Sequence, residues 1–319
     1  MQRKTREGGP PSDLARPADS REWLGTLLGI LAIVFWSTTI AFGRRLTEEI
    51  GVWTATSAAF MMGGTISCVF WSARYGTPRA LLRHRPTYLL GSGGLFVAYI
   101  ICLYGAIGLA TNRQQVLEVG VLNYLWPASV LVFSVPLQGF KPRPGLWVGI
   151  LLAITGAVLA LAQQGDLSWA SWQRNLVTAP LPYVLAVCGA LAWALYSNLS
   201  RKFGPTDGVG AQPVFVLATA AVLLLLRSMV HENSRWTTET LLLLAYNSIF
   251  PVTLAYAFWD YAMRTGKIVL LASLSYLIPI LSTGISAMFL RLTPGVTLWA
   301  ACVLVIGGAV VCRLSLREH

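Results

Sequence analysis

Two carboxylates, Glu118 and Asp260, lie inside long apolar stretches of the sequence, where ionisable side chains are rare and usually functional. Basic residues lie close to both: Arg113 precedes Glu118, and Arg264 and Lys267 follow Asp260. This spacing predicts a gate or a helix-end ion pair at each carboxylate, with a plain interfacial charge as the alternative. Neither carboxylate lies at the middle of its stretch, so proton coupling and facilitated movement down a gradient both stay open.

Aromatic side chains recur in the same stretches at helical spacing. Tyr256, Trp259 and Asp260 share one helical face, and Trp193 and Tyr196 are three residues apart. The other candidates are Tyr99, Tyr104, Asn123, Tyr124, Trp126 and Tyr276. Rings around a cavity can stack on an apolar ligand while their polar tips contact its amino or carboxylate group. We predict such a binding cavity for the set, although helix packing or an interfacial belt is the alternative for any single ring.

Two prolines fall at matching places in the sequence. Pro127 cannot donate a backbone hydrogen bond, and its ring crowds the carbonyl of Asn123; Pro279 does the same to Ser275. We predict a kinked helix at each proline, with freed backbone polarity facing a cavity. The alternative is that Asn123 and Ser275 only satisfy their local backbone.

The sequence carries none of the patterns expected of an enzyme. His84, His231 and His319 all lie outside the apolar stretches, so no histidine pair can hold haem or a metal there. The HExxH, GxSxG and P-loop patterns are absent, and the five cysteines form no CxxC pair. We therefore predict no enzymatic activity, no metal, no cofactor and no ATP-driven transport.

Composition identifies the solvent that these stretches face. The chain has 319 residues, of which 55% are hydrophobic and 12% charged, with a mean hydropathy of +0.62. Soluble domains average roughly 25% charged residues, so lipid must cover much of this surface. The net charge of +11 does not indicate a nucleic-acid interface, because the basic residues lie in short gaps between apolar runs.

Ten stretches are long and apolar enough to cross a bilayer as helices. They are 24–43, 52–72, 87–109, 115–137, 145–162, 181–200, 210–230, 239–262, 268–290 and 295–313. The polar, Pro-rich residues 1–23 are expected to form a disordered cytoplasmic tail, and residues 315–319 a second tail. Segments on the side of the amino terminus hold 17 of the 24 Lys and Arg residues, and the other side holds 7. This bias predicts that both termini lie in the cytoplasm.

An internal repeat organises the ten helices. The Tyr124–Pro127 motif, YLWP, is echoed 152 residues later by YLIP at Tyr276–Pro279, and the same offset relates Tyr104 to Tyr256. Trp36 and Trp193 match at an offset of 157. We predict two five-helix repeats, 24–162 and 181–314, joined by an external linker, 163–180. Because each half has an odd number of spans, the second half is inverted, with the substrate site between the halves.

This layout resembles the drug/metabolite transporter superfamily of the EamA type. Residues 33–38, 95–102 and 118–127 resemble the branch of YddG-like aromatic amino acid exporters. The resemblance implies ten helices around a central cavity, and export of aromatic and other neutral amino acids across the inner membrane of a bacterium by alternating access. An exporter of other metabolites or drugs is the alternative, and a ligand-sensing receptor a remote one. The expected partners are an amino acid and the bilayer, and a monomer is compatible with the sequence.

Overall fold

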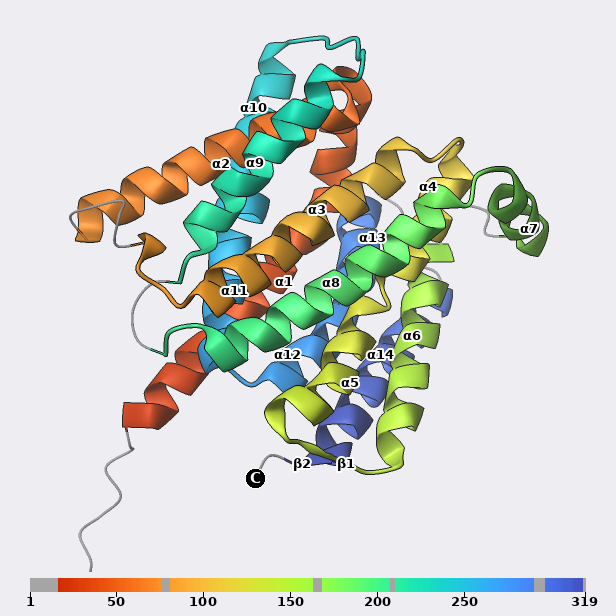
Figure 1. Ribbon diagram of the computed structural model, residues 1–319. Helices are drawn as coiled ribbons and strands as arrows, with labels where there is room; N and C mark the ends of the chain where they lie inside the picture. The colour runs from red at the N-terminus through yellow and green to blue at the C-terminus, as the bar shows by residue number, and fades with distance from the viewer. Residues whose placement is uncertain (1–16, 76–80, 163–167, 207–209, 290–295, 318–319) are drawn as a thin grey trace, which may run out of the picture.

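The computed structural model describes residues 17–75, 81–162, 168–206, 210–289 and 296–317, and it is almost entirely helical (Figure 1). Residues 17–23, which we expected to belong to a disordered tail, instead form the first turns of α1, because Pro17 suits the first position of a helix. The remainder of that tail and residues 163–167 of the predicted linker lie outside the described residues. The linker also contains a helix, α7 (Trp169–Thr178).

The described residues contain ten apolar helical segments, several of them built from more than one helix. They are α1 (Pro17–Ile50), α2 (Val52–Tyr75), η2 with α3 (Thr87–Ser92, Gly93–Gly108), α4 with α5 (Arg113–Asn123, Trp126–Gln138), α6 (Gly145–Ala162), α8 (Leu181–Phe203), α9 (Gln212–Ser228), α10 with η3 and α11 (Thr238–Asn247, Ser248–Leu254, Ala255–Thr265), α12 with η4 and α13 (Ile268–Leu274, Ser275–Leu277, Ile278–Phe289), and α14 (Val296–Ser315). Within the described ranges, nine are long and apolar enough to cross a membrane, and α9 is a shorter apolar helix. The prediction of an all-α membrane protein with ten helices is confirmed.

The packing of the spans is two-fold symmetric between the halves. α1 packs on α11 as α8 packs on α3, which pairs the first and eighth spans in the same way as the sixth and third. α2 packs on α9 and α6 on α14, so the second and fifth spans meet their own counterparts. This exchange of equivalent partners is the contact pattern expected of two similar halves around a common axis.

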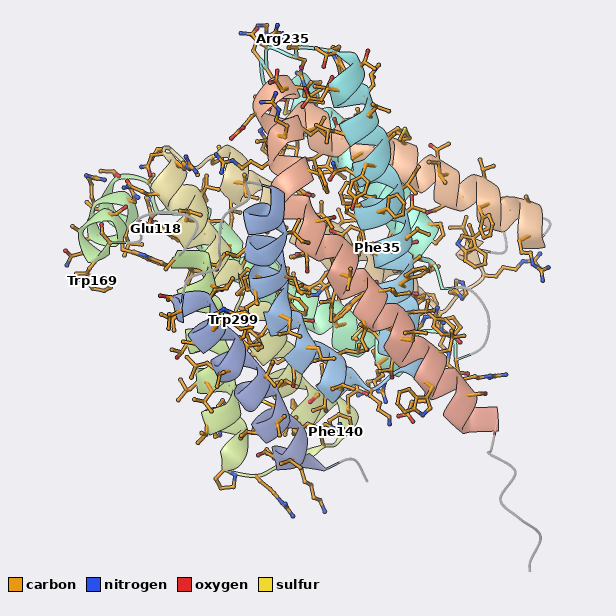
Figure 2. All side chains as sticks on the ribbon, turned by 180° about the vertical axis from the view of Figure 1, so that it is seen from behind. Phe35, Glu118, Phe140, Trp169, Arg235 and Trp299 are labelled. Atoms are coloured by element: carbon orange, nitrogen blue, oxygen red, sulfur yellow. The ribbon has the colours of Figure 1, made fainter. Side chains whose placement is uncertain are left out.

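The α6–α14 pair shows how small residues allow this packing. A Cβ atom at Gly308 would lie 2.6 Å from the carbonyl oxygen of Gly149, so only glycine permits the approach. The outer faces of both helices are apolar and exposed, with Leu151 and Trp299 each 65% exposed (Figure 2). Lipid is the only solvent that suits such faces.

Both ends of the described chain lie on one side of the molecule, here called the termini side (Figure 1). There β1 (Lys141–Pro142) pairs antiparallel with β2 (Leu316–Arg317), so residues 316–317 of the predicted second tail are paired. The opposite side, here called the far side, carries the α1–α2 turn and α7. Figure 2 shows Arg235 at the far side and Phe140 near the termini side.

Candidate functional site

The helix that contains Pro127 is broken where the sequence predicts a kink. α4 ends at Asn123 and α5 begins at Trp126, so Tyr124 and Leu125 interrupt the span. The Tyr124 amide donates to the carbonyls of residues 120 and 121, and the Leu125 amide donates to Leu122, as the chain tightens before the proline. The side-chain oxygen of Asn123 is buried and accepts no hydrogen bond in the described structure. The break therefore leaves an unused acceptor at this depth.

The second half is broken at the equivalent place. α12 ends at Leu274, a short 3₁₀ turn follows over Ser275–Leu277, and α13 resumes before Pro279. Ser275 donates its hydroxyl to the carbonyl of Leu271, so this side chain does satisfy its local backbone. Each half thus contains an interrupted helix at the equivalent position, and the hinge role of Pro127 and Pro279 stays a prediction.

Between the halves lies a cluster of aromatic rings, here called the aromatic cluster, centred on Trp193. Trp193 is 1% exposed, and its ring centroid lies 4.5 Å from that of Tyr99 and 5.0 Å from that of Tyr196. Further rings lie within 6.1 Å of it: Trp36, Phe96, Trp126, Tyr256 and Trp259. The rings come from α1, α3 and α5 of the first half and from α8 and α11 of the second. The cluster thus bridges the interface between the halves.

Indole N–H groups in the aromatic cluster differ in their partners. Trp259 donates to the hydroxyl of Ser197 at 3.2 Å, and Trp36 donates to the carbonyl of Pro251 at 3.3 Å. The N–H of Trp193 is buried and has no hydrogen-bond partner among the described residues. A buried donor without a partner lowers the stability of the fold, and in a functional protein such a donor commonly binds water or a ligand.

Tyrosine hydroxyls border one side of the aromatic cluster. The hydroxyl of Tyr99 lies within electrostatic range of the hydroxyls of Tyr104, Tyr124 and Tyr256, and the amide of Asn123 is next to Tyr99. Tyr104, Asn123 and Tyr124 keep partial exposure, whereas Trp193 and Trp259 are buried. These three half-buried residues form the edge of the cluster, here called the rim. None of these side chains carries a formal charge.

The structure brings together nine of the ten predicted binding residues; Tyr276 lies apart. Its ring is fully buried, and its hydroxyl lies near Cys312 of α14 and the backbone of Ala128. The sequence-based prediction omitted Trp36, which lies 5.3 Å from Trp259 and 5.6 Å from Trp193. The repeat had already matched Trp36 with Trp193, and this was the signal that could have found it. The binding role of all these residues stays a prediction.

The described surface also carries two grooves away from Trp193. One, of about 660 Å³, runs between α2 and α9 and includes Met61, Met62 and Arg227. The other, of about 230 Å³, lies between α5, α6 and α8 and reaches Leu125 beside the first helix break. Rings fill the space between the halves in the described structure, so the predicted central cavity stays a prediction.

Asp260 forms a buried ion pair on the termini side. Its carboxylate lies 3.0 Å from Nε of Arg264, and the two side chains are 2% and 3% exposed. Tyr88 donates its hydroxyl to the same carboxylate at 2.9 Å and Tyr196 at 3.3 Å. Lys267, the other expected partner, instead lies over the ring of Trp23. Full pairing of this kind is what allows two charges to remain out of water.

Glu118 lies on the far side and makes no ion pair with Arg113 in the described structure, contrary to that part of the prediction. Five residues of α-helix separate the two side chains by about 140°, so Arg113 points outward and is exposed. The carboxylate of Glu118 accepts hydrogen bonds from Ser171 at 2.6 Å, Asn175 at 3.0 Å and Tyr183. These hydrogen bonds hold α7, which lies beside Glu118 in Figure 2, against α4 and α8.

His84 lies between the second and third spans, next to the ion pair of Asp260 and Arg264. Its ring is 5.7 Å from that of Tyr88. Partial burial and the positive charge of Arg264 hold the pKa of His84 below its usual value. We expect this imidazole to be neutral at physiological pH.

This membrane protein has two structurally similar halves, a helix break at the equivalent position in each, and an uncharged aromatic cluster between them. These are the features of a secondary transporter. The described residues contain no group of three or more His, Cys, Asp or Glu side chains that could hold a metal ion.

Comparison with known proteins identifies the family. The chain belongs to the EamA-like transporter family, which matches residues 23–162 and again 180–314. It is 32% identical to the aromatic amino acid exporter YddG of Escherichia coli K12 and 35% identical to that of Ancylobacter novellus, over 92% of this chain and 98% of each relative. A solved crystal structure with 32% identity superposes with a TM-score of 0.75 over 91% of this chain and 97% of the other. The predicted family is confirmed, and the protein is a transporter and not an enzyme.

Proposed function

We propose that this transporter exports aromatic amino acids, and other neutral amino acids, across the inner membrane of a bacterium. The observation that carries the proposal is the aromatic cluster around Trp193, together with its lack of charge. An amino acid with an apolar side chain is a zwitterion of zero net charge, so entering an uncharged site leaves no uncompensated net charge in a medium of low dielectric constant. Its side chain can stack on the rings.

Polar groups within the aromatic cluster and at its rim supply contacts for the two charged ends of the zwitterion. The unpaired N–H of Trp193 is a donor for the carboxylate, and the unpaired side-chain oxygen of Asn123 is an acceptor for the ammonium. The hydroxyls of Tyr99, Tyr104 and Tyr124 can act as either. The export names of the relatives support the same substrate class.

The proposed mechanism is alternating access. The segments on either side of the breaks at Pro127 and Pro279 move so that the site between the halves faces one side and then the other. Asp260 and Glu118 lie toward opposite sides, and we assign a gate to each. The bias of basic residues supports a cytoplasmic location for the termini side.

Flux into proteoliposomes tests the proposal. Liposomes containing the protein are preloaded with unlabelled amino acids, and uptake of radiolabelled phenylalanine, tryptophan and threonine is followed with and without a proton gradient. We expect protein-dependent uptake of both aromatic amino acids, and competition by lysine or glutamate at least about tenfold weaker than by phenylalanine, because a net charge must be desolvated. If protein shown to be folded transported none of these amino acids, we would conclude that its substrate is another metabolite. Stimulation by the gradient would establish proton coupling, and indifference to it facilitated movement.

A further inference from the structure

The ion pair of Asp260 belongs to a larger buried cluster, here called the lock, formed by Tyr88, Tyr196, Asp260 and Arg264. All four residues are less than 10% exposed. One oxygen of the Asp260 carboxylate accepts hydrogen bonds from both tyrosines, and the other meets Nε of Arg264. Both oxygens of the Asp260 carboxylate therefore accept a hydrogen bond from a buried donor.

The connection between α8 and α9 lies directly on the lock. Nη1 of Arg264 donates to the carbonyl of Pro205 at 2.6 Å, and the amide of Ala211 donates to the hydroxyl of Tyr88 at 3.3 Å. A Cβ atom at Gly210 would overlap Oδ2 of Asp260 and the hydroxyl of Tyr88, so only glycine allows the backbone to approach this closely. The described ends of this connection, at Pro205 and at Gly210 and Ala211, thus cover the ion pair.

The lock joins the two halves of the protein on the termini side. Tyr88 comes from η2 in the first half, whereas Tyr196, Asp260 and Arg264 come from α8 and α11 in the second half. Parting the halves on this side must break the bond between Tyr88 and Asp260. A buried ion pair is stable when fully paired or when fully hydrated, and intermediate arrangements are costly. The lock therefore favours two discrete states, one closed and dry and one open and wet.

The same residues touch the aromatic cluster. The ring of Tyr196 lies 5.0 Å from that of Trp193, while its hydroxyl reaches Asp260. Trp259 directly precedes Asp260 in α11, and its ring lies 6.0 Å from that of Trp193. A ligand that displaces the rings of Trp193 or Trp259 must therefore move groups that hold the lock.

We propose that Tyr88, Asp260 and Arg264 keep the termini side of the transport path closed, and that Tyr196 and Trp259 link this closure to the substrate site. The proposal rests on the proposed function, since a closure has meaning only in a transport cycle. Asp260, Arg264 and Tyr88 act as positioning residues and do not contact substrate.

A cysteine reporter measures the closure without any substrate. Ser92 lies one helical turn after Tyr88, is fully buried, and its hydroxyl has no hydrogen-bond partner among the described residues, so Ser92→Cys is a mild change. It is introduced after replacement of the five native cysteines, which are Cys68, Cys102, Cys188, Cys302 and Cys312. Its rate of reaction with a membrane-impermeant maleimide is measured in intact cells and in inverted vesicles, which expose opposite sides.

Tyr88→Phe keeps the ring and the ion pair but removes the bond between the halves. We expect its labelling rate from the termini side to rise at least about tenfold, the lower end of the range for one hydrogen bond to a charged group. Asp260→Asn should raise the rate further. Tyr246→Phe is the matched control, because it removes a hydroxyl that donates to Thr38 on the far side at 2.8 Å and should leave the rate unchanged.

Rates within twofold of the parent in both Tyr88→Phe and Asp260→Asn would overturn the lock. If Asp260→Asn does not fold, Tyr88→Phe alone decides. The two proposals fail separately: a lock that opens as expected in a protein that moves no aromatic amino acid refutes only the substrate, and aromatic flux with unchanged labelling refutes only the lock.

Discussion

Replacement of Trp193 by Phe should weaken substrate binding while leaving the fold almost as stable. The indole N–H of Trp193 has no partner in the described structure, so the substrate-free protein bears the cost of an unsatisfied donor, about 1–3 kcal/mol. Phe removes this cost but leaves a small void among the surrounding rings, which costs about 1–2 kcal/mol. The two terms offset each other, and the free energy of unfolding should change by no more than about 1 kcal/mol.

Binding should respond differently, because the proposed partner of this N–H is the carboxylate of the substrate. Loss of one hydrogen bond to a charged group costs about 1.5–3 kcal/mol, or roughly 10- to 150-fold in the Kd for phenylalanine. The Kd is measured by scintillation proximity on purified protein, and stability by thermal unfolding in the same detergent.

Trp259→Phe is the comparison variant, since its N–H is already satisfied by Ser197. It removes a bond inside the protein, so it should lower stability more and affinity less than Trp193→Phe. A Kd for Trp193→Phe within threefold of the wild type would refute the assignment of its N–H to the substrate. The same conclusion would follow if the two variants ranked in the opposite order.

Three further predictions follow from the described contacts. The double change Pro127→Ala and Pro279→Ala should lower the rate of phenylalanine exchange at unchanged expression, because continuous helices resist the bending at the breaks; unchanged rates would remove the kinks from the mechanism. Gly308→Leu should lower Tm, with a cost of about 1–3 kcal/mol or more from overpacking against α6, whereas a Cβ atom at Gly307 would meet no atom within 4 Å, so Gly307→Leu should leave Tm nearly constant. The pKa of His84 is lowered in the folded protein, so stability is full above the usual value of 6.5 and falls as the pH drops below it; His84→Gln should flatten the decline of Tm between pH 6.5 and 5, and an equal decline would contradict this.

Local patterns in the sequence predicted the fold well, because lipid imposes length and hydropathy on every span. α6 was predicted at its observed bounds, 145–162, and Pro127 indicated the break that ends α4 at Asn123. The pair of Asp260 and Arg264 was predictable because four residues bring side chains together on one helical face. Each of these features depends on residues that are close in the sequence.

Contacts between distant segments escaped the prediction. The carboxylate of Glu118 is held by Ser171 and Asn175, more than 50 residues away, on a helix that no apolar run announces. Tyr276 matches Tyr124 by the repeat but packs near Cys312, because the surroundings of equivalent residues differ between the halves. Sequence repetition therefore predicted which backbone segments are equivalent, and it did not predict what their side chains touch.

The repeat also predicts that, in the proposed cycle, the two ends of the transport path close by different chemistry. At the offset of 152 residues, Asp260 corresponds to Gly108 and Arg264 to Asn112, which caps α4 by accepting from the amide of Gln115. Inversion of the second half places these equivalents on the far side, where neither carries a charge. At these equivalent positions, the described part of the far side therefore lacks a counterpart of the Asp260–Arg264 ion pair, and we expect the two closed states to differ in free energy. If the lock operates as proposed, the substrate-free protein rests closed on the termini side, and a substrate that enters from there must supply the binding energy to open it.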